Sequence, residues 1–246
     1  MDSRFSLEDK TILVTGASSG IGRSIAIECS YVGAKVVLNG RNQEQLQCTY
    51  DRLLGEGHQI IQADLTDEEQ RLALVQKVPK LDGLVHSAGI GSRVLCKMLE
   101  VEDLRYVMRV NFESPVLLQA ELLREKKIIK GSSIVFIASA AATMPSVGNG
   151  IYSASKAALI SYAKCLSLEL ASRKIRVNCI SPAMVWTNLS LIGATEDQLR
   201  EAEQTYPLKR YAQPEDIAPM AVYLLSDQSS WVTGSNMELT GGTQTL

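Results

Sequence analysis

Residues 11–32 join a short apolar run to a helical pattern through three closely spaced glycines, Gly16, Gly20 and Gly22. The run Thr11–Thr15 is rich in β-branched residues and stops at the first glycine, which predicts a strand. Apolar residues then recur at helical spacing, at Ile21, Ile25, Cys29 and Val32. Glycine lets the backbone approach an anion without a Cβ in the way, and a helix N-terminus offers unpaired N–H groups. The segment predicts a strand–loop–helix unit that binds a phosphate; an ordinary glycine-rich turn is the alternative.

Strand and helix patterns alternate along the rest of the chain. The expected strands are Thr11–Thr15, Lys35–Leu38, Gln59–Ala63, Gly83–Ser87, Ser133–Ala138, Arg176–Ile180 and Asn236–Leu239. The expected helices cover residues 21–32, 43–54, 66–78, 101–126, 152–172 and 214–226, and Thr66 with Glu69 resembles a capping box for the third. Several strands are continuous apolar runs, as parallel strands buried on both faces are. The pattern predicts one α/β domain over residues 1–246, Rossmann-type and doubly wound, with a mainly parallel seven-stranded sheet.

Composition excludes several classes of function. The formal net charge of −2 creates no strong field for nucleic acid or an acidic membrane. The first ten residues lack the apolar segment of a secretory signal, and the apolar stretch at residues 134–144 is too short to span a bilayer. The five cysteines are scattered without a Cys-x-x-Cys pair, which favours a reduced, cytoplasmic chain with no metal site.

A second motif indicates acid–base chemistry. Tyr152 and Lys156 are four residues apart, so they share one face of the expected helix. A free phenol has a pKa of about 10, and a neighbouring ammonium is expected to lower it. Ser139, at the end of the fifth expected strand, can hold a carbonyl oxygen against this phenol. A tyrosine and a lysine at this spacing also occur together by chance.

Taken in order, Thr-Gly-x-x-x-Gly-x-Gly and the later Tyr-x-x-x-Lys resemble the short-chain dehydrogenase/reductase family over essentially the whole chain. The resemblance implies an oxidoreductase with catalytic residues Asn111, Ser139, Tyr152 and Lys156, in which Lys156 also binds the nicotinamide ribose and Asn111 bends its helix. It implies cofactor contacts from Gly16, Ser18, Ser19, Gly20, Ile21, Gly22, Asp64, Leu65, Ser87, Ala88, Gly89, Tyr152, Lys156, Pro182, Val185 and Thr187. Ser87 and Ala183 replace the family's asparagine and glycine, and His86 is expected to be structural.

The end of the second expected strand bears on the choice of cofactor. Relatives that use NAD carry an acidic residue there, whereas this chain has Gly40 followed by Arg41. A guanidinium can bind a 2′-phosphate through charge-assisted hydrogen bonds. We expect NADP(H) to be preferred, with NAD(H) as the alternative.

Residues 184–211 are expected to form a substrate lid, in which Trp186, Leu189, Leu191, Ile192, Leu199 and Tyr206 either line a pocket or pack among themselves. Leu191, Met144 and Val147 are candidates for an apolar pocket.

The general pattern is similar to 3-oxoacyl-[acyl-carrier-protein] reductases, and Arg173 with Lys126, Lys127 and Lys130 are candidates for contact with an acyl carrier protein. Sugar, polyol, steroid and small ketone substrates stay open, as does a catalytically silent NADP-binding sensor. The resemblance also implies a homotetramer.

Overall fold

A computed structural model describes residues 5–243. A single sheet forms the centre of the molecule, and all six neighbouring strand pairs are parallel, in the order β3-β2-β1-β4-β5-β6-β7. The strands are β1 (Thr11–Thr15), β2 (Lys35–Gly40), β3 (Gln59–Gln62), β4 (Leu81–His86), β5 (Ile128–Ile137), β6 (Arg176–Pro182) and β7 (Asn236–Leu239). The predicted seven-stranded, doubly wound α/β fold is confirmed, and the sheet is wholly rather than mainly parallel.

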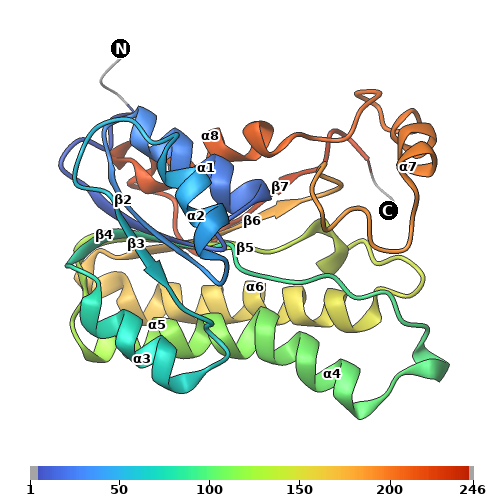
Figure 1. Ribbon diagram of the computed structural model, residues 1–246, viewed down its shortest axis with the longest axis horizontal. Coiled ribbons are helices and arrows are strands. Elements are labelled where there is room, and N and C mark those ends of the chain that lie inside the picture. Colours follow the sequence, from blue (N-terminus) through green and yellow to red (C-terminus); the bar gives the residue numbers. More distant parts are fainter. Residues whose placement is uncertain (1–4, 244–246) are drawn as a thin grey trace.

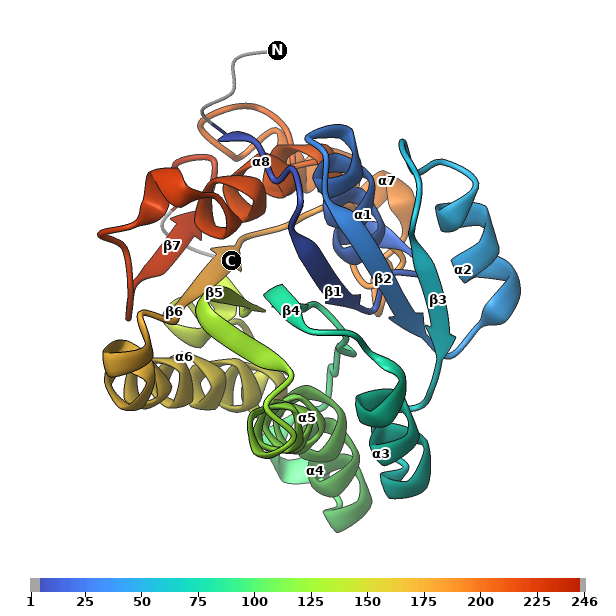
Figure 2. The same cartoon turned by 90° about the vertical axis from the view of Figure 1, so that its left-hand side faces the viewer.

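Helices cover both faces of the sheet (Figures 1 and 2). They are α1 (Gly20–Tyr31), α2 (Gln43–Tyr50), α3 (Glu68–Lys77), α4 (Val101–Met108), α5 (Ser114–Arg124), α6 (Gly150–Leu170), α7 (Glu196–Glu203) and α8 (Pro214–Leu225). Leu13 of β1 belongs to the core under α3, α5 and α6, whereas Ile12 and Val14 belong to the core under α1 and α8. Each central strand is therefore buried on both sides, which explains its continuous apolar sequence.

Three expected helix boundaries were wrong. The single helix expected at residues 101–126 is two helices joined by a π-helical turn at Arg109–Glu113. The third helix is capped by Asp67, whose side chain accepts a hydrogen bond from the Gln70 amide at 3.0 Å, while Thr66 donates to Asp64. The second helix ends at Tyr50 instead of Leu54. Local carboxylate caps and turns decide these ends, and apolar periodicity does not report them.

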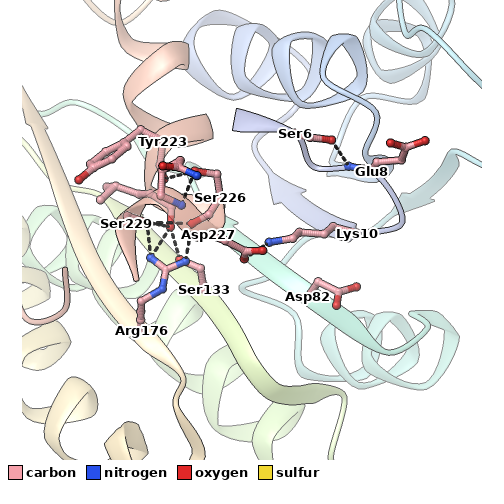
Figure 3. Close-up of polar contacts among 12 residues, drawn as sticks. Ser6, Glu8, Lys10, Asp82, Ser133, Arg176, Tyr223, Ser226, Asp227 and Ser229 are labelled. Carbon is pink, nitrogen blue, oxygen red and sulfur yellow. Dashed lines mark hydrogen bonds and ion pairs between the residues drawn. The ribbon is translucent and has the colours of Figure 1, made fainter. Parts of the chain in front are cut away.

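The C-terminal end of α8 is fixed to the sheet by Arg176 at the start of β6 (Figure 3). Its guanidinium donates to the carbonyl oxygens of Leu224 at 2.7 Å and Ser226 at 3.0 Å, and Ser133 of β5 donates to the same Leu224 oxygen at 2.6 Å. These bonds satisfy carbonyls that a helix end leaves without intrahelical partners. The other end of α8, at Pro214, lies next to the segment that follows β6.

Within residues 5–243, no helix combines the length and the apolar character that crossing a bilayer requires.

Candidate active site

The strand order reverses between β1 and β4, and the loops that follow these two strands touch. Gly16 has φ +65°, and a Cβ there would lie 2.8 Å from the Ala88 Cα. A Cβ on Gly22 would lie 2.4 Å from the Gly16 carbonyl oxygen. Only glycine fits at either position, and open α/β sheets bind ligands at such a reversal of strand order.

The glycine loop leads directly into the N-terminus of α1. Ser19 is the N-cap residue, and its side chain makes no capping hydrogen bond. The first turn of α1 contains no acidic residue. Its positive dipole end is therefore not neutralised by a local carboxylate, which suits the binding of an anion.

The residues predicted to hold the adenosine end gather beside β2. Gly40 lies against Ser18, since a Cβ there would be 3.3 Å from the Ser18 Oγ. Arg41 is exposed, and its Nη1 lies 4.0 Å from Asp64 Oδ2. Arg71 donates to the Leu65 carbonyl at 3.1 Å while paired with buried Glu121 at 2.9 Å. The turn at Asp64 and Leu65, predicted to contact the adenine, is thus held in place by side chains of α3 and α5.

Thr15 supports the loop after β4. Its Oγ1 accepts hydrogen bonds from the amides of Ser87 at 3.1 Å and Ala88 at 3.2 Å. The adjacent Gly89 faces the catalytic group, because a Cβ there would lie 3.3 Å from both Lys156 Nζ and Asn111 Oδ1. The phosphate loop and the predicted catalytic residues therefore meet across one short segment.

The four predicted catalytic residues lie in one connected group. Ser139 lies close enough to the Tyr152 phenol to affect its pKa, and Lys156 Nζ lies 5.9 Å from the centroid of the Tyr152 ring. Asn111, in the π-helical turn, donates to Ser155 Oγ at 3.1 Å and to the Ile90 carbonyl at 2.9 Å. The amide of Ile90 donates back to Asn111 Oδ1 at 2.8 Å. The turn in the helix thus aims this side chain inward, as the resemblance implies.

Burial controls the protonation of this group. It raises the pKa of Tyr152 above its ordinary value, and the neighbouring Ser139 side chain opposes this increase. It also lowers the pKa of Lys156 to about 8, and Lys156 Nζ donates to the Ile137 carbonyl at 2.9 Å. Burial thus makes the phenol less acidic in the chain without a cofactor, and the expected lowering of its pKa by the ammonium stays a prediction for the chain with cofactor bound.

The segment after β6 continues along the same edge. The Ala183 amide donates to Leu239 of β7 at 3.0 Å, and φ of Ala183 is not positive, so alanine replaces the expected glycine without backbone strain. Val185 is buried in the core under α1 and α8. Thr187, two residues later, has its Cγ2 3.1 Å from the position that a Cβ on Gly20 would occupy. Pro182, Val185 and Thr187 thus extend toward the phosphate loop.

Much of the predicted lid packs on itself. Leu199 and Tyr206 form a small cluster with Tyr211 and Trp186, and the Trp186 indole donates to Glu203 at 2.9 Å. Helix α7, which carries Leu199, was not predicted, although Thr195 and Gln198 form the capping box that begins it.

The remaining apolar residues of the lid face outward. Leu189, Leu191 and Ile192 are 40–46% exposed, and a Cβ on Gly91, in the loop after β4, would lie 3.0 Å from Ile192 Cδ1 and 3.3 Å from Leu189 Cδ1. Val147 is 80% exposed. The apolar pocket expected from Met144, Val147 and Leu191 stays a prediction.

The basic residues proposed for a carrier lie at the amino ends of the strands. Arg173 donates to the carbonyl of Ile128, the first residue of β5, at 2.6 Å. Lys127 donates to the Val78 carbonyl at 2.7 Å. Within one chain these residues are at the sheet edge opposite Tyr152.

Sequence reasoning missed Arg23, which contacts the phosphate loop. Its guanidinium donates to the Ser18 carbonyl, to Gln45 at 2.8 Å and to Thr49 at 3.1 Å. The sequence signal that could have indicated this contact is the position of Arg23 directly after Gly22, the last glycine of the motif.

Comparisons with known proteins match nearly the whole chain. A family model described as enoyl-(acyl carrier protein) reductase matches residues 16–244. The 3-oxoacyl-[acyl-carrier-protein] reductase FabG of Rickettsia felis is 35% identical over 237 residues, which are 96% of this chain and 97% of that protein. A solved short-chain dehydrogenase/reductase family protein has a TM-score of 0.87 at 33% identity, covering 96% of this chain and 98% of that one. A structure from Beutenbergia cavernae, described as an NAD(P)-dependent gluconate 5-dehydrogenase with NADP bound at low occupancy, has a TM-score of 0.87 at 31% identity, with 97% and 98% covered.

His86 is the last residue of β4, the strand-end position expected for it, and its side chain is buried. It stacks on Phe136 at 4.5 Å between ring centroids, and burial lowers its pKa to about 4. An unfolded histidine titrates near 6.5, so the unfolded chain binds more protons between pH 6.5 and 4. We predict that the free energy of unfolding falls by up to about 3 kcal/mol as pH is lowered through this window.

Urea unfolding across this pH range measures the effect. His86→Phe should lose this part of the pH dependence, whereas the control Phe136→Leu should be less stable at every pH and keep it. Parallel curves for His86→Phe and the wild type would contradict the assignment.

Proposed function

Because the chain belongs to the short-chain dehydrogenase/reductase family and is an oxidoreductase of CH–OH groups, we propose that it interconverts a carbonyl and a secondary alcohol with NADP(H). The supporting observation is that four side chains converge beside a glycine loop with no room for a Cβ. They are Ser139, Tyr152, Lys156 and Asn111. This loop fits a dinucleotide pyrophosphate, and the bound cofactor supplies or accepts the hydride.

Tyr152 transfers the proton in this proposal. Burial keeps its phenol protonated, which suits donation to a carbonyl oxygen during reduction. Ser139 holds the same oxygen by a second hydrogen bond. In the reverse direction the phenolate must form, and the positive charges of Lys156 and an oxidised nicotinamide ring favour it. All four catalytic residues are present, which argues against a silent sensor.

Arg41 supports NADP(H) over NAD(H). Its side chain is 62% exposed, so it can turn toward a 2′-phosphate, and Gly40 presents no carboxylate to repel that phosphate. Asp64 is the carboxylate nearest to the guanidinium, at 4.0 Å. The Beutenbergia cavernae structure, with NADP bound, is consistent with this preference.

A 3-oxoacyl thioester is the substrate class we propose. The FabG relatives act on such substrates by name, and exposed Leu189, Leu191 and Ile192 offer apolar contact to an acyl chain. A sugar acid is the second candidate, because a structural neighbour is described as a gluconate 5-dehydrogenase.

Assembly as a homotetramer would bury apolar side chains that one chain leaves exposed. Leu168 of α6 is 79% exposed and Trp231, shortly before β7, is 98% exposed. Arg173 and Lys130 lie at the end of the sheet opposite the proposed site of their own chain. An acyl carrier protein bound to them would therefore serve the site of a neighbouring subunit. We also propose a cytoplasmic location, in keeping with the absence of a spanning helix from the described residues.

For the proposed function, the first prediction concerns the proton donor. Tyr152→Phe should lower turnover at least ~100-fold, because it removes the general acid and keeps the ring. Its dissociation constant for NADPH, measured by fluorescence, should be nearly unchanged. Tyr162→Phe, a matched change on the same helix, should keep its activity. Near-wild-type turnover in Tyr152→Phe would end this assignment.

The second prediction concerns cofactor choice. Arg41→Asp should shift the ratio of kcat/KM for NADPH over NADH toward NADH by about tenfold or more, because a carboxylate repels the 2′-phosphate. Steady-state kinetics with both cofactors measure the ratio. Arg124→Asp, an equal charge change on α5, should leave it unaltered. An unchanged ratio in Arg41→Asp would remove Arg41 from the argument.

The third prediction concerns the substrate. In a carbonyl panel followed by loss of NADPH absorbance, acetoacetyl thioesters should exceed 5-oxo sugar acids in kcat/KM by about tenfold or more, because apolar pockets favour acyl chains by this order. The reverse order would favour the sugar-acid alternative.

A further inference from the structure

Two side chains outside the glycine motif bind the backbone of the phosphate loop. Arg23 of α1 donates to the Ser18 carbonyl, and Thr49 of α2 donates to the Ala17 carbonyl at 2.9 Å. The two are also joined, because Arg23 Nε donates to Thr49 Oγ1 at 3.1 Å. Two successive loop carbonyls are therefore held from the side on which α2 lies.

This attachment fixes the direction of the loop amides. In a planar trans peptide the N–H points opposite to the C=O of the same unit. Binding the carbonyls of Ala17 and Ser18 toward α2 therefore turns the amides of Ser18 and Ser19 away from it. The preceding amide, of Ala17, is separately bound to the Asn39 carbonyl at 3.0 Å. Amides fixed in this way need no reorganisation when an anion arrives.

Arg23 also brings a positive charge to this place. The guanidinium lines a cavity of about 430 Å³ together with Ser19, Gly20 and Thr187, the residues around which a pyrophosphate is expected. Its hydrogen-bond acceptors are the neutral Ser18 carbonyl, Gln45 and Thr49. Among residues 5–243, no carboxylate forms an ion pair with it. Glu28 and Glu215 also line the cavity, but neither forms an ion pair with Arg23, so the guanidinium charge favours an anion beside the glycine loop.

We propose that Arg23 and Thr49 are positioning residues for the pyrophosphate of the dinucleotide, acting through the backbone of the glycine loop. The proposal rests on the proposed function only in taking a nicotinamide dinucleotide as the ligand. NADPH and NADH share the pyrophosphate, so both should depend on these residues equally. This separates Arg23 from Arg41, which is expected to discriminate between the two cofactors.

The test compares Arg23→Met and Thr49→Val with the control Ser30→Ala. Ser30 also joins α1 to the segment after α2, by accepting from the Leu54 amide at 3.1 Å, but it does not touch the loop. Dissociation constants for NADPH and NADH are measured by fluorescence titration, and folding by circular dichroism and Tm. Both loop variants should weaken both cofactors about tenfold at an unchanged NADPH-to-NADH ratio, the order of one hydrogen bond to a charged or buried group. Ser30→Ala should lower Tm without changing either constant.

Unchanged constants in folded Thr49→Val would overturn the proposal, and so would equal weakening in Ser30→Ala, which would indicate general loosening of α1 and α2. Selective loss of NADPH in Arg23→Met would instead assign Arg23 to the 2′-phosphate. If Arg23→Met does not fold, Arg23→Lys replaces it, since lysine keeps the charge and loses the forked contacts. A wild-type chain that binds both cofactors but reduces no carbonyl would refute the proposed function and leave this test intact.

Discussion

The arrangement of the predicted site depends on the contact between the loops that follow β1 and β4. These strands are neighbours at the point where the strand order reverses, and their loops approach so closely that Gly16 cannot carry a Cβ, while the Gly16 carbonyl in turn leaves no room for one on Gly22. Thr15 joins them by binding the amides of Ser87 and Ala88. One contact therefore sets both the position of the phosphate loop and that of Gly89, which faces Lys156. A displacement here would separate the proposed cofactor site from the proposed proton donor.

Burial sets the protonation state of Tyr152, the proposed proton donor, before any ligand binds. Lost solvation disfavours the charged form of both Tyr152 and Lys156, so it raises the pKa of the phenol and lowers that of the ammonium. A neutral phenol that donates a proton is the natural state of such a site. Forming the phenolate requires an additional positive charge. Alcohol oxidation therefore depends on the charge of the oxidised cofactor, whereas carbonyl reduction starts from the neutral phenol and needs no such charge.

The sequence predicted the architecture well because its signals are local or periodic. Continuous apolar strands, glycines after β1 and the Tyr152–Lys156 spacing need no knowledge of tertiary contacts. What it missed depends on partners distant in the chain. The π-helical turn at Asn111 is held by Ile90 and Ser155, and the effect of burial on Tyr152 depends on how densely the edge packs. Arg23 lay beside the motif, but its partner Thr49 is 26 residues away.

The lid is a third packing unit, separate from the two cores beside the sheet. Along the extended segment after β6, Val185 enters the core under α1 and α8, whereas its neighbours Met184 and Trp186 join the lid cluster. Alternation of side chains along extended backbone produces this division. Val185 is anchored in the core, and two residues later Thr187 lies beside Gly20. In the proposed site, the lid cluster could therefore differ between relatives without moving the residues proposed to hold the cofactor, in keeping with relatives named for acyl and for sugar substrates on this fold.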